Sequence, residues 1–229
     1  MINIKGLYEI HITVDMENLF NLWKYVDEHP GTKLILAVSK EGSFKHQYMI
    51  SKWKNGTYEQ VLAKMRTIEE DMKSYDINLV RSKIESMAHN KGVPETEEEM
   101  TEYLKNTLVD SEIRSEQLVG KPYFEYHAKI DLNKKSIDDL ETVLNGNYLT
   151  SNDKLGDDTY FNASVNICGS KKYLITIRIY NHGRTYSEKQ KDIVLDYIKE
   201  QGYIIDIAIQ QEFSVYDDND SIDIGWLIY

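Results

Sequence analysis

The chain opens with a stretch in which apolar and polar residues alternate. Within residues 7–15, Ile10, Ile12 and Val14 fall on one face of an extended strand, and polar residues fall on the other face. Apolar residues then recur at helical spacing over 19–26, before a His-Pro-Gly sequence ends the run. This pattern predicts a half-buried strand followed by a helix.

The next segments predict a hairpin, a second helix and a fourth strand. Two short apolar runs at 34–38 and 47–53 flank a turn around Gly42, which indicates two antiparallel neighbours. A capping-box pattern opens a helix at 57–72, and residues 77–85 have the pattern of a strand. The buried stripe expected on that helix consists of Val61, Met65, Ile68 and Met72.

The second half of the chain repeats this order of elements. The expected elements are a strand at 122–131, a helix capped by Ser136, a hairpin around Cys168, a helix capped by Ser187 and Gln190, and a long strand at 203–215. Each half therefore predicts a strand-helix-strand-strand-helix-strand (βαββαβ) unit.

Two further segments differ in composition from these units. Residues 87–120 contain an acidic helix that Thr96 and Glu99 open with a capping box, and we expect this segment to be a helical connector. The acidic residues 217–220 lack the glycine and the distal glutamate of a calcium loop, so they predict a solvated turn. An apolar segment at 224–229 follows and is, with the acidic helix, a candidate surface for a protein partner.

The first strands of the two units carry the same polar residues. The matches are Glu9 with Glu125, His11 with His127 and Asp15 with Asp131. Internal duplication is the simplest account of this match together with the repeated order of elements. We therefore expect an α+β fold of duplicated ferredoxin-like units with antiparallel sheets and pseudo-two-fold symmetry, in which 1–86 and 121–229 are the units and 87–120 is the connector.

In a ferredoxin-like unit both helices cover one face of the sheet, so polar residues of the central strands point to the other face. On the two first strands, these residues are Glu9, His11, Thr13, Glu125, His127 and Lys129. Neighbouring strands are expected to add Gln47, Arg81, Lys83, Thr176 and Arg178. If the two faces meet or flank a common cleft, these groups make a cationic interior in an acidic protein.

Composition narrows the possible partners. The formal net charge is −11 and the pI is about 5.1, which disfavours long nucleic acid but allows a small anion in a local basic pocket. No apolar run approaches the roughly 20 residues of a membrane span, and the first residues lack the pattern of a signal peptide. The single cysteine, Cys168, agrees with a reducing compartment. We therefore expect a cytoplasmic protein without a membrane segment.

Two short motifs resemble those of known enzyme families. His11 and Thr13 match the His-x-Thr motif of the two-histidine phosphoesterase superfamily, which has a duplicated bilobal fold with one histidine per lobe; in the second half, Lys129 stands where that motif has a hydroxyl residue. The segment from Glu125 to Lys129 is similar to the Glu-x-Glu-x-Lys motif of the CYTH triphosphate-tunnel enzymes, with His127 in place of the middle glutamate.

The first resemblance implies a metal-independent phosphodiesterase-like hydrolase that acts on a nucleotide or other small phosphate ester without a cofactor. One histidine would take a proton from the nucleophile and the other would donate one to the leaving oxygen, while Arg178, Lys129 and Arg81 stabilise charge on the phosphate. The sequence leaves open which histidine is the acid. It also leaves open the alternative of a non-catalytic protein that sequesters a phosphorylated messenger or binds a protein partner.

Overall fold

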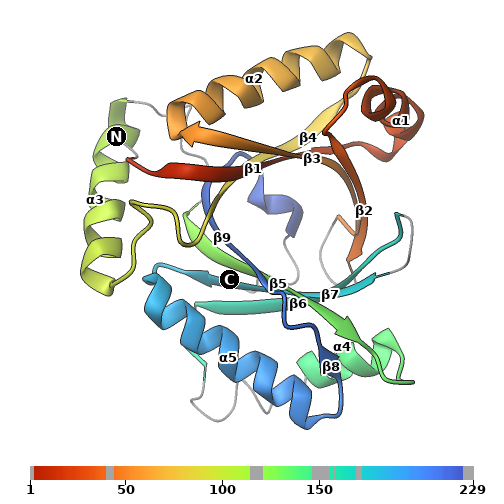
Figure 1. Cartoon of the computed structure of the whole chain (residues 1–229), viewed down its shortest axis with the longest axis vertical. Helices are drawn as coiled ribbons and strands as arrows, with labels where there is room; N and C mark the ends of the chain where they lie inside the picture. The colour runs from red at the N-terminus through yellow and green to blue at the C-terminus, as the bar shows by residue number, and fades with distance from the viewer. Residues whose placement is uncertain are drawn as a thin grey trace.

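Strands from both halves of the chain join in one large antiparallel sheet with helices on its outside (Figure 1). The computed structural model describes residues 3–39, 44–113, 121–145, 155–156, 158–168 and 172–223. Within these ranges the protein is α+β, with five α-helices. None of the helices in these ranges has the length and apolar character needed to cross a membrane.

The first half follows the predicted order of elements. They are β1 (Lys5–Val14), the 3-10 turn η1 (Met16–Asn18), α1 (Leu19–Glu28), β2 (Lys33–Ser39), β3 (His46–Thr57), α2 (Tyr58–Ser74) and β4 (Leu79–Met87). The predicted capping box at Thr57 and Gln60 is present, and the stripe predicted on α2 is buried. The turn predicted around Gly42 lies outside the described residues.

The second half contains two departures from the prediction. Its elements are α3 (Glu97–Ile113), β5 (Tyr123–Asp131), α4 (Ile137–Asn145), β6 (Thr159–Asn166), β7 (Lys172–Tyr180), α5 (Arg184–Glu200), β8 (Ile204–Ile205), β9 (Gln210–Asp217) and the 3-10 turn η2 (Asp220–Asp223). Ser187 and Gln190 do not cap α5, because Gly183 is its N-cap and both residues are buried within the helix. The long final strand is interrupted between β8 and β9.

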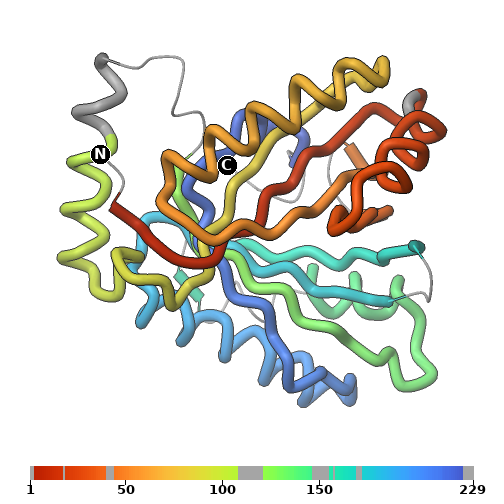
Figure 2. Tube along the Cα trace, turned by 45° about the horizontal axis from the view of Figure 1, so that its top comes forward, coloured from red at the N-terminus to blue at the C-terminus, as the bar shows by residue number. Residues whose placement is uncertain are grey.

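The sheet closes on itself. Eight strands follow one another in the order β1, β3, β2, β6, β7, β5, β9 and β4, and β4 pairs again with β1. All these pairs are antiparallel, and β8 pairs with the end of β5 outside the ring. Two seams join the halves of the chain: β2 with β6, and β4 with β9. In Figure 2 the red-to-yellow half lies against the green-to-blue half along these seams.

The two halves run through the sheet in the same strand order. The first contributes β2-β3-β1-β4 and the second contributes β6-β7-β5-β9, so β1 and β5 lie between two strands of their own half, as the sequence predicts. Figure 1 shows α1 and α2 outside the first set of strands, and α4 and α5 outside the second. Side chains that point away from these helices therefore point into the ring.

The prediction that β1 is half-buried is wrong, because closure of the sheet buries both of its faces. Ile10, Ile12 and Val14 are fully buried on the helix side, and each contributes about 1.5–3 kcal/mol to folding. His11 and Thr13, on the other side, are also buried. Polar groups inside the ring thus lose most of their water and must find partners in the protein.

Candidate functional site: the interior cavity

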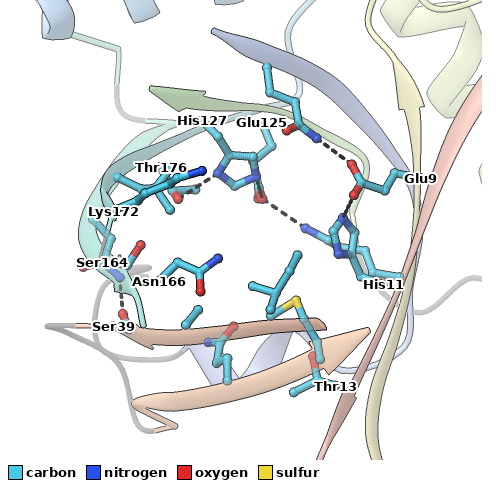
Figure 3. Close-up of a pocket in the computed structure, with 18 of the residues that line it drawn as sticks. Glu9, His11, Thr13, Ser39, Glu125, His127, Ser164, Asn166, Lys172 and Thr176 are labelled. Atoms are coloured by element: carbon cyan, nitrogen blue, oxygen red, sulfur yellow. Dashed lines mark hydrogen bonds and ion pairs between the residues drawn. The ribbon is translucent and has the colours of Figure 1, made fainter. Parts of the chain in front are cut away.

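The ring encloses a cavity of about 370 Å³, which we call the interior cavity. The eleven residues that the sequence predicts as site residues all line it: Glu9, His11, Thr13, Gln47, Arg81, Lys83, Glu125, His127, Lys129, Thr176 and Arg178. Figure 3 shows His11 and His127 pointing into this cavity from β1 and β5. The residues that were predicted to flank a cleft between the two halves thus lie together inside the closed sheet.

One end of the cavity is occupied by a carboxylate from η2. Asp223, whose exposed fraction is 1%, accepts hydrogen bonds on Oδ2 from Nη1 of Arg81 and from Nη1 of Arg178, each at 2.8 Å. Its Oδ1 accepts a hydrogen bond from Nε2 of Gln47 at 2.7 Å. Burial alone would raise the pKa of Asp223, but the two guanidinium groups hold it below its usual value. The side-chain amide of Gln47 is thus already hydrogen-bonded to another residue of the protein.

Arg81 has a second carboxylate partner at the end of β9. Its Nε donates to Oδ1 of Asp217 at 2.8 Å, its Nη2 donates to Oδ2, and the Tyr123 hydroxyl donates to the same Oδ2 at 2.9 Å. The prediction of a solvated turn at 217–220 is wrong for Asp217, which is buried as the last residue of β9. The reason is the bidentate pair, whose paired charges offset the loss of water.

Glu125 joins three positively charged or ionisable groups at the centre of the cavity. Its Oε2 accepts from Nε of Arg178, and its Oε1 lies 3.0 Å from Nζ of Lys83 and 2.9 Å from Nε2 of His127. Burial acts to raise the pKa of Glu125, but Arg178 and Lys83 lower it well below its usual value. Lys83 also lies 2.8 Å from Oε1 of Glu85.

These pairs correct the prediction of a cationic interior. Arg81, Lys83 and Arg178 are buried, and each is matched by two carboxylates. The sequence-based prediction counted the cations, placed Asp217 in a solvated turn and did not consider Asp223. The strand β9 and the turn η2 instead carry those acids into the ring.

The two histidines have different surroundings. His127 uses both ring nitrogens: Nε2 lies 2.9 Å from Glu125 and Nδ1 lies 3.0 Å from Oγ1 of Thr176. The exposed fraction of His11 is 9%, and its Nε2 lies 3.1 Å from Oε2 of Glu85 and 3.7 Å from Oε1 of Glu9. Among the described residues, neither ring nitrogen of His11 has a hydrogen-bond partner, and only Nε2 has a carboxylate within ion-pair distance. His11 is therefore the histidine with an unused ring nitrogen.

Glu212 of β9 lies beside His11 and Glu9 in what we call the Glu-His cluster. Its Oε1 accepts a hydrogen bond from Nε2 of Gln210 at 2.9 Å, and its Oε2 has no hydrogen-bond partner among the described residues. Burial, together with the nearby charges of Glu85 and Glu9, raises the pKa of Glu212 well above its usual value. The arrangement favours a protonated carboxyl group at this position.

Three lysines surround the mouth of the cavity and are called the rim lysines: Lys33, Lys129 and Lys172. All three are exposed, and none has a salt-bridge partner within the part of the chain that the structure describes. Thr13, the counterpart of Lys129 in the first half, is buried instead. The two halves thus contribute differently to the cavity, as the sequence difference at these positions suggests.

Sequence reasoning missed Glu212, Asp217, Asp223, Lys33 and Lys172. A signal was present for Glu212, because polar and apolar residues alternate along β9 as they do along β1. Lys33 and Lys172 are the first residues of their strands and belong to no sequence motif that would have identified them. The apolar segment 224–229, predicted as a contact surface, lies outside the described residues.

The fold and the cavity define an α+β protein built on a closed antiparallel sheet with a charged interior. Comparison with known proteins adds no closer identification: the sequence matches no family model and no curated protein.

Proposed function

We propose that this protein binds a nucleotide or other small phosphate ester in the interior cavity, with the rim lysines as its phosphate contacts. The observation that carries the proposal is the contrast between the cations of the cavity. The buried cations are neutralised by carboxylates, whereas the three rim lysines have no salt-bridge partner among the described residues. An anion that enters the mouth would supply that partner.

The size of the cavity supports a ligand no larger than a single nucleotide. Small-molecule sites commonly have volumes of about 300–1,000 Å³, and the interior cavity, at about 370 Å³, is near the lower limit. Thr176 and His127 lie on the same strands as Lys172 and Lys129, so they would contact the bound ester next. In this proposal Arg81, Lys83 and Arg178 maintain the shape of the cavity.

The proposal includes hydrolysis of the ester by His11 and His127 as acid and base. The unused Nδ1 of His11 supports a role as the group that accepts a proton. His127 would first have to exchange its hydrogen bond with Thr176 for one with the ligand.

The test is a panel of cyclic and linear nucleotides, with binding measured by calorimetry and product measured by chromatography. We expect Lys129→Gln and Lys172→Gln each to weaken binding about tenfold, since a charge-assisted hydrogen bond contributes about 1.5–3 kcal/mol. Lys73→Gln, at an exposed position of α2, is the matched control. Wild-type affinity in both rim variants, or no ligand in the panel, would contradict the proposal.

The second candidate is a non-catalytic protein that sequesters a phosphorylated messenger in the cytoplasm or binds a protein partner. It is favoured by the engagement of both ring nitrogens of His127 and by the neutralised cations around Glu125. Stoichiometric binding without product would support this candidate. Product formation that is lost in both His11→Gln and His127→Gln would support hydrolysis.

We also propose that the chain arose by duplication of a ferredoxin-like unit, with 1–86 and 121–229 as the copies and 87–120 as the connector. The shared strand order of the two halves supports this origin. Superposition of β2-β3-β1-β4 on β6-β7-β5-β9 is the test. We expect Glu9 to fall on Glu125 and His11 on His127; a shifted register would contradict it.

A further inference from the structure

The Glu-His cluster brings three donor groups together inside the ring. Glu9 and His11 project from β1, Glu212 projects from β9, and β4 separates these two strands. One donor atom from each residue lies within 4.8 Å of the other two. All three side chains are buried, so the cluster is shielded from bulk water.

The polar atoms of this cluster are incompletely satisfied. Oε2 of Glu212 and Nδ1 of His11 have no hydrogen-bond partner among the described residues. The amide of Gln210 donates to Oε2 of Glu9 at 2.5 Å and to Oε1 of Glu212 at 2.9 Å. Gln210 thereby holds the two carboxyl groups side by side, although like charges at this distance repel each other.

The nearest lysine does not remove this repulsion. Lys83 lies 2.8 Å from Glu85 and 3.0 Å from Glu125, so its charge is shared between carboxylates next to the cluster. No salt bridge joins Glu9 or Glu212 to a lysine or arginine in the described residues. A buried group of acids in this situation needs another positive charge or a proton.

The donor spacing fits a metal ion. Bonds from a divalent cation to carboxylate oxygen and imidazole nitrogen are about 2.0–2.2 Å long, so two donors of one ion are at most about 4.4 Å apart. Donors within 4.8 Å of one another reach that limit with shifts of a few tenths of an ångström. Oε2 of Glu85, 3.1 Å from Nε2 of His11, is near enough to be a fourth donor.

We propose that Glu9, His11 and Glu212 bind one divalent transition-metal cation inside the ring. The combination of an imidazole with carboxylates suits Zn²⁺ or Mn²⁺ better than Mg²⁺ or Ca²⁺, which prefer oxygen ligands alone. Gln210 acts as a positioning residue, because it orients two of the ligands. This site goes beyond the proposed function, since it requires no phosphate ester.

The test is calorimetric titration of the metal-free protein with ZnCl₂ and, separately, with MnCl₂, in a buffer that contains no phosphate. We expect one ion per chain. His11→Gln and Glu212→Gln should each weaken binding at least about 100-fold. Ser214→Ala, two residues from Glu212 on the same strand, should bind as the wild type does.

The variants separate a lost ligand from a lost fold. Glutamine keeps the shape of Glu212 and removes a buried acid, so this variant should remain folded by circular dichroism. Failure of both metals to bind the wild type, or unchanged affinity in both ligand variants, would overturn the inference. Neither result would affect phosphate binding by the rim lysines, which is measured with other ligands. A bound metal would engage His11 and so exclude its role as the proton acceptor in hydrolysis.

Discussion

Glu85 and Glu212 lie in one buried group of carboxyls, yet their pKa values shift in opposite directions. Burial raises both, but Lys83 and His11 overcome it at Glu85 and lower its pKa to about 2. Glu212 has no cation at such a distance, and its carboxylate neighbours raise its pKa further. The close contacts of Lys83 and His11 with Glu85 therefore account for the opposite directions of the two pKa shifts.

Replacing Glu212 by glutamine should stabilise the metal-free protein at neutral pH. Above pH 4.5, the usual pKa of the group, the folded state holds a proton that the unfolded state has released, so the wild type loses stability as the pH rises. Glutamine does not titrate, and we expect a gain of about 1–2 kcal/mol, or about 2–8 °C in Tm. Thermal unfolding at pH 7 and pH 4 measures this.

The gain should disappear at pH 4, where Glu212 is protonated in both states. A destabilised Glu212→Gln variant at pH 7 would show that the charged carboxylate is favoured in the folded protein and would contradict the assignment.

Removing the carboxylate of Asp223 should be costly. Asp223→Asn leaves Arg81 and Arg178 facing each other across an uncharged amide, and we expect a loss of about 3 kcal/mol in the free energy of unfolding. Urea denaturation measures the loss. Asp220→Asn is the matched control in the same turn, and its effect should stay below about 1 kcal/mol. Equal effects of the two substitutions would argue against the bridge.

At the scale of elements, local patterns account for most of the fold. The period-two alternation of β1, the capping box of α2 and its apolar stripe depend on residues close in sequence, and all three were predicted. Which side chains of α1 become buried depends less on residues close in sequence. Phe20 follows the apolar pattern of that helix, yet its exposed fraction is 81%.

The predictions that were wrong depend on contacts between distant segments. The helix α5 begins at Arg184 because the backbone of Arg184 and Thr185 donates to Pro94 and Glu95 of the connector. Asp217 was predicted to be solvated and Asp223 was not predicted as a site residue, because nothing near them in the sequence shows that they pair with Arg81 and Arg178. The predicted residues line one cavity, but the prediction that its interior is cationic is wrong.

The start of α5 supplies a test of this packing. A Cβ added to Gly183 would lie 2.5 Å from the carbonyl carbon and oxygen of Thr96, so the connector would have to move. We expect Gly183→Ala to destabilise the protein by about 1–3 kcal/mol in urea. Thr185→Ala, at an exposed position in the first turn of the same helix, should be nearly neutral. A neutral Gly183→Ala would mean that the connector yields easily.

For the whole molecule, the two seams of the ring are unequal. Within the described residues, β2 and β6 pair over 37–39 and 164–166, whereas β4 and β9 pair over 83–87 and 212–217. The second seam is also crossed by the ion pairs of Arg81. The seam between β2 and β6 therefore has fewer paired residues to keep it closed.

We expect the ring to open first between β2 and β6. Hydrogen exchange followed by mass spectrometry should show faster exchange for the β2 and β6 amides than for those of β4 and β9. A saturating ligand in the cavity should slow exchange at this seam. The reverse order of exchange would place the opening elsewhere.

The ion pairs inside the ring have a further consequence for folding. Arg81 and Lys83 belong to the first half of the chain, but the carboxylates of Asp217, Asp223 and Glu125 belong to the second. Either half alone would have to expose or neutralise these groups, however well its own strands pair. The two halves should therefore melt together in one cooperative transition, as a single folding unit with no independently stable part.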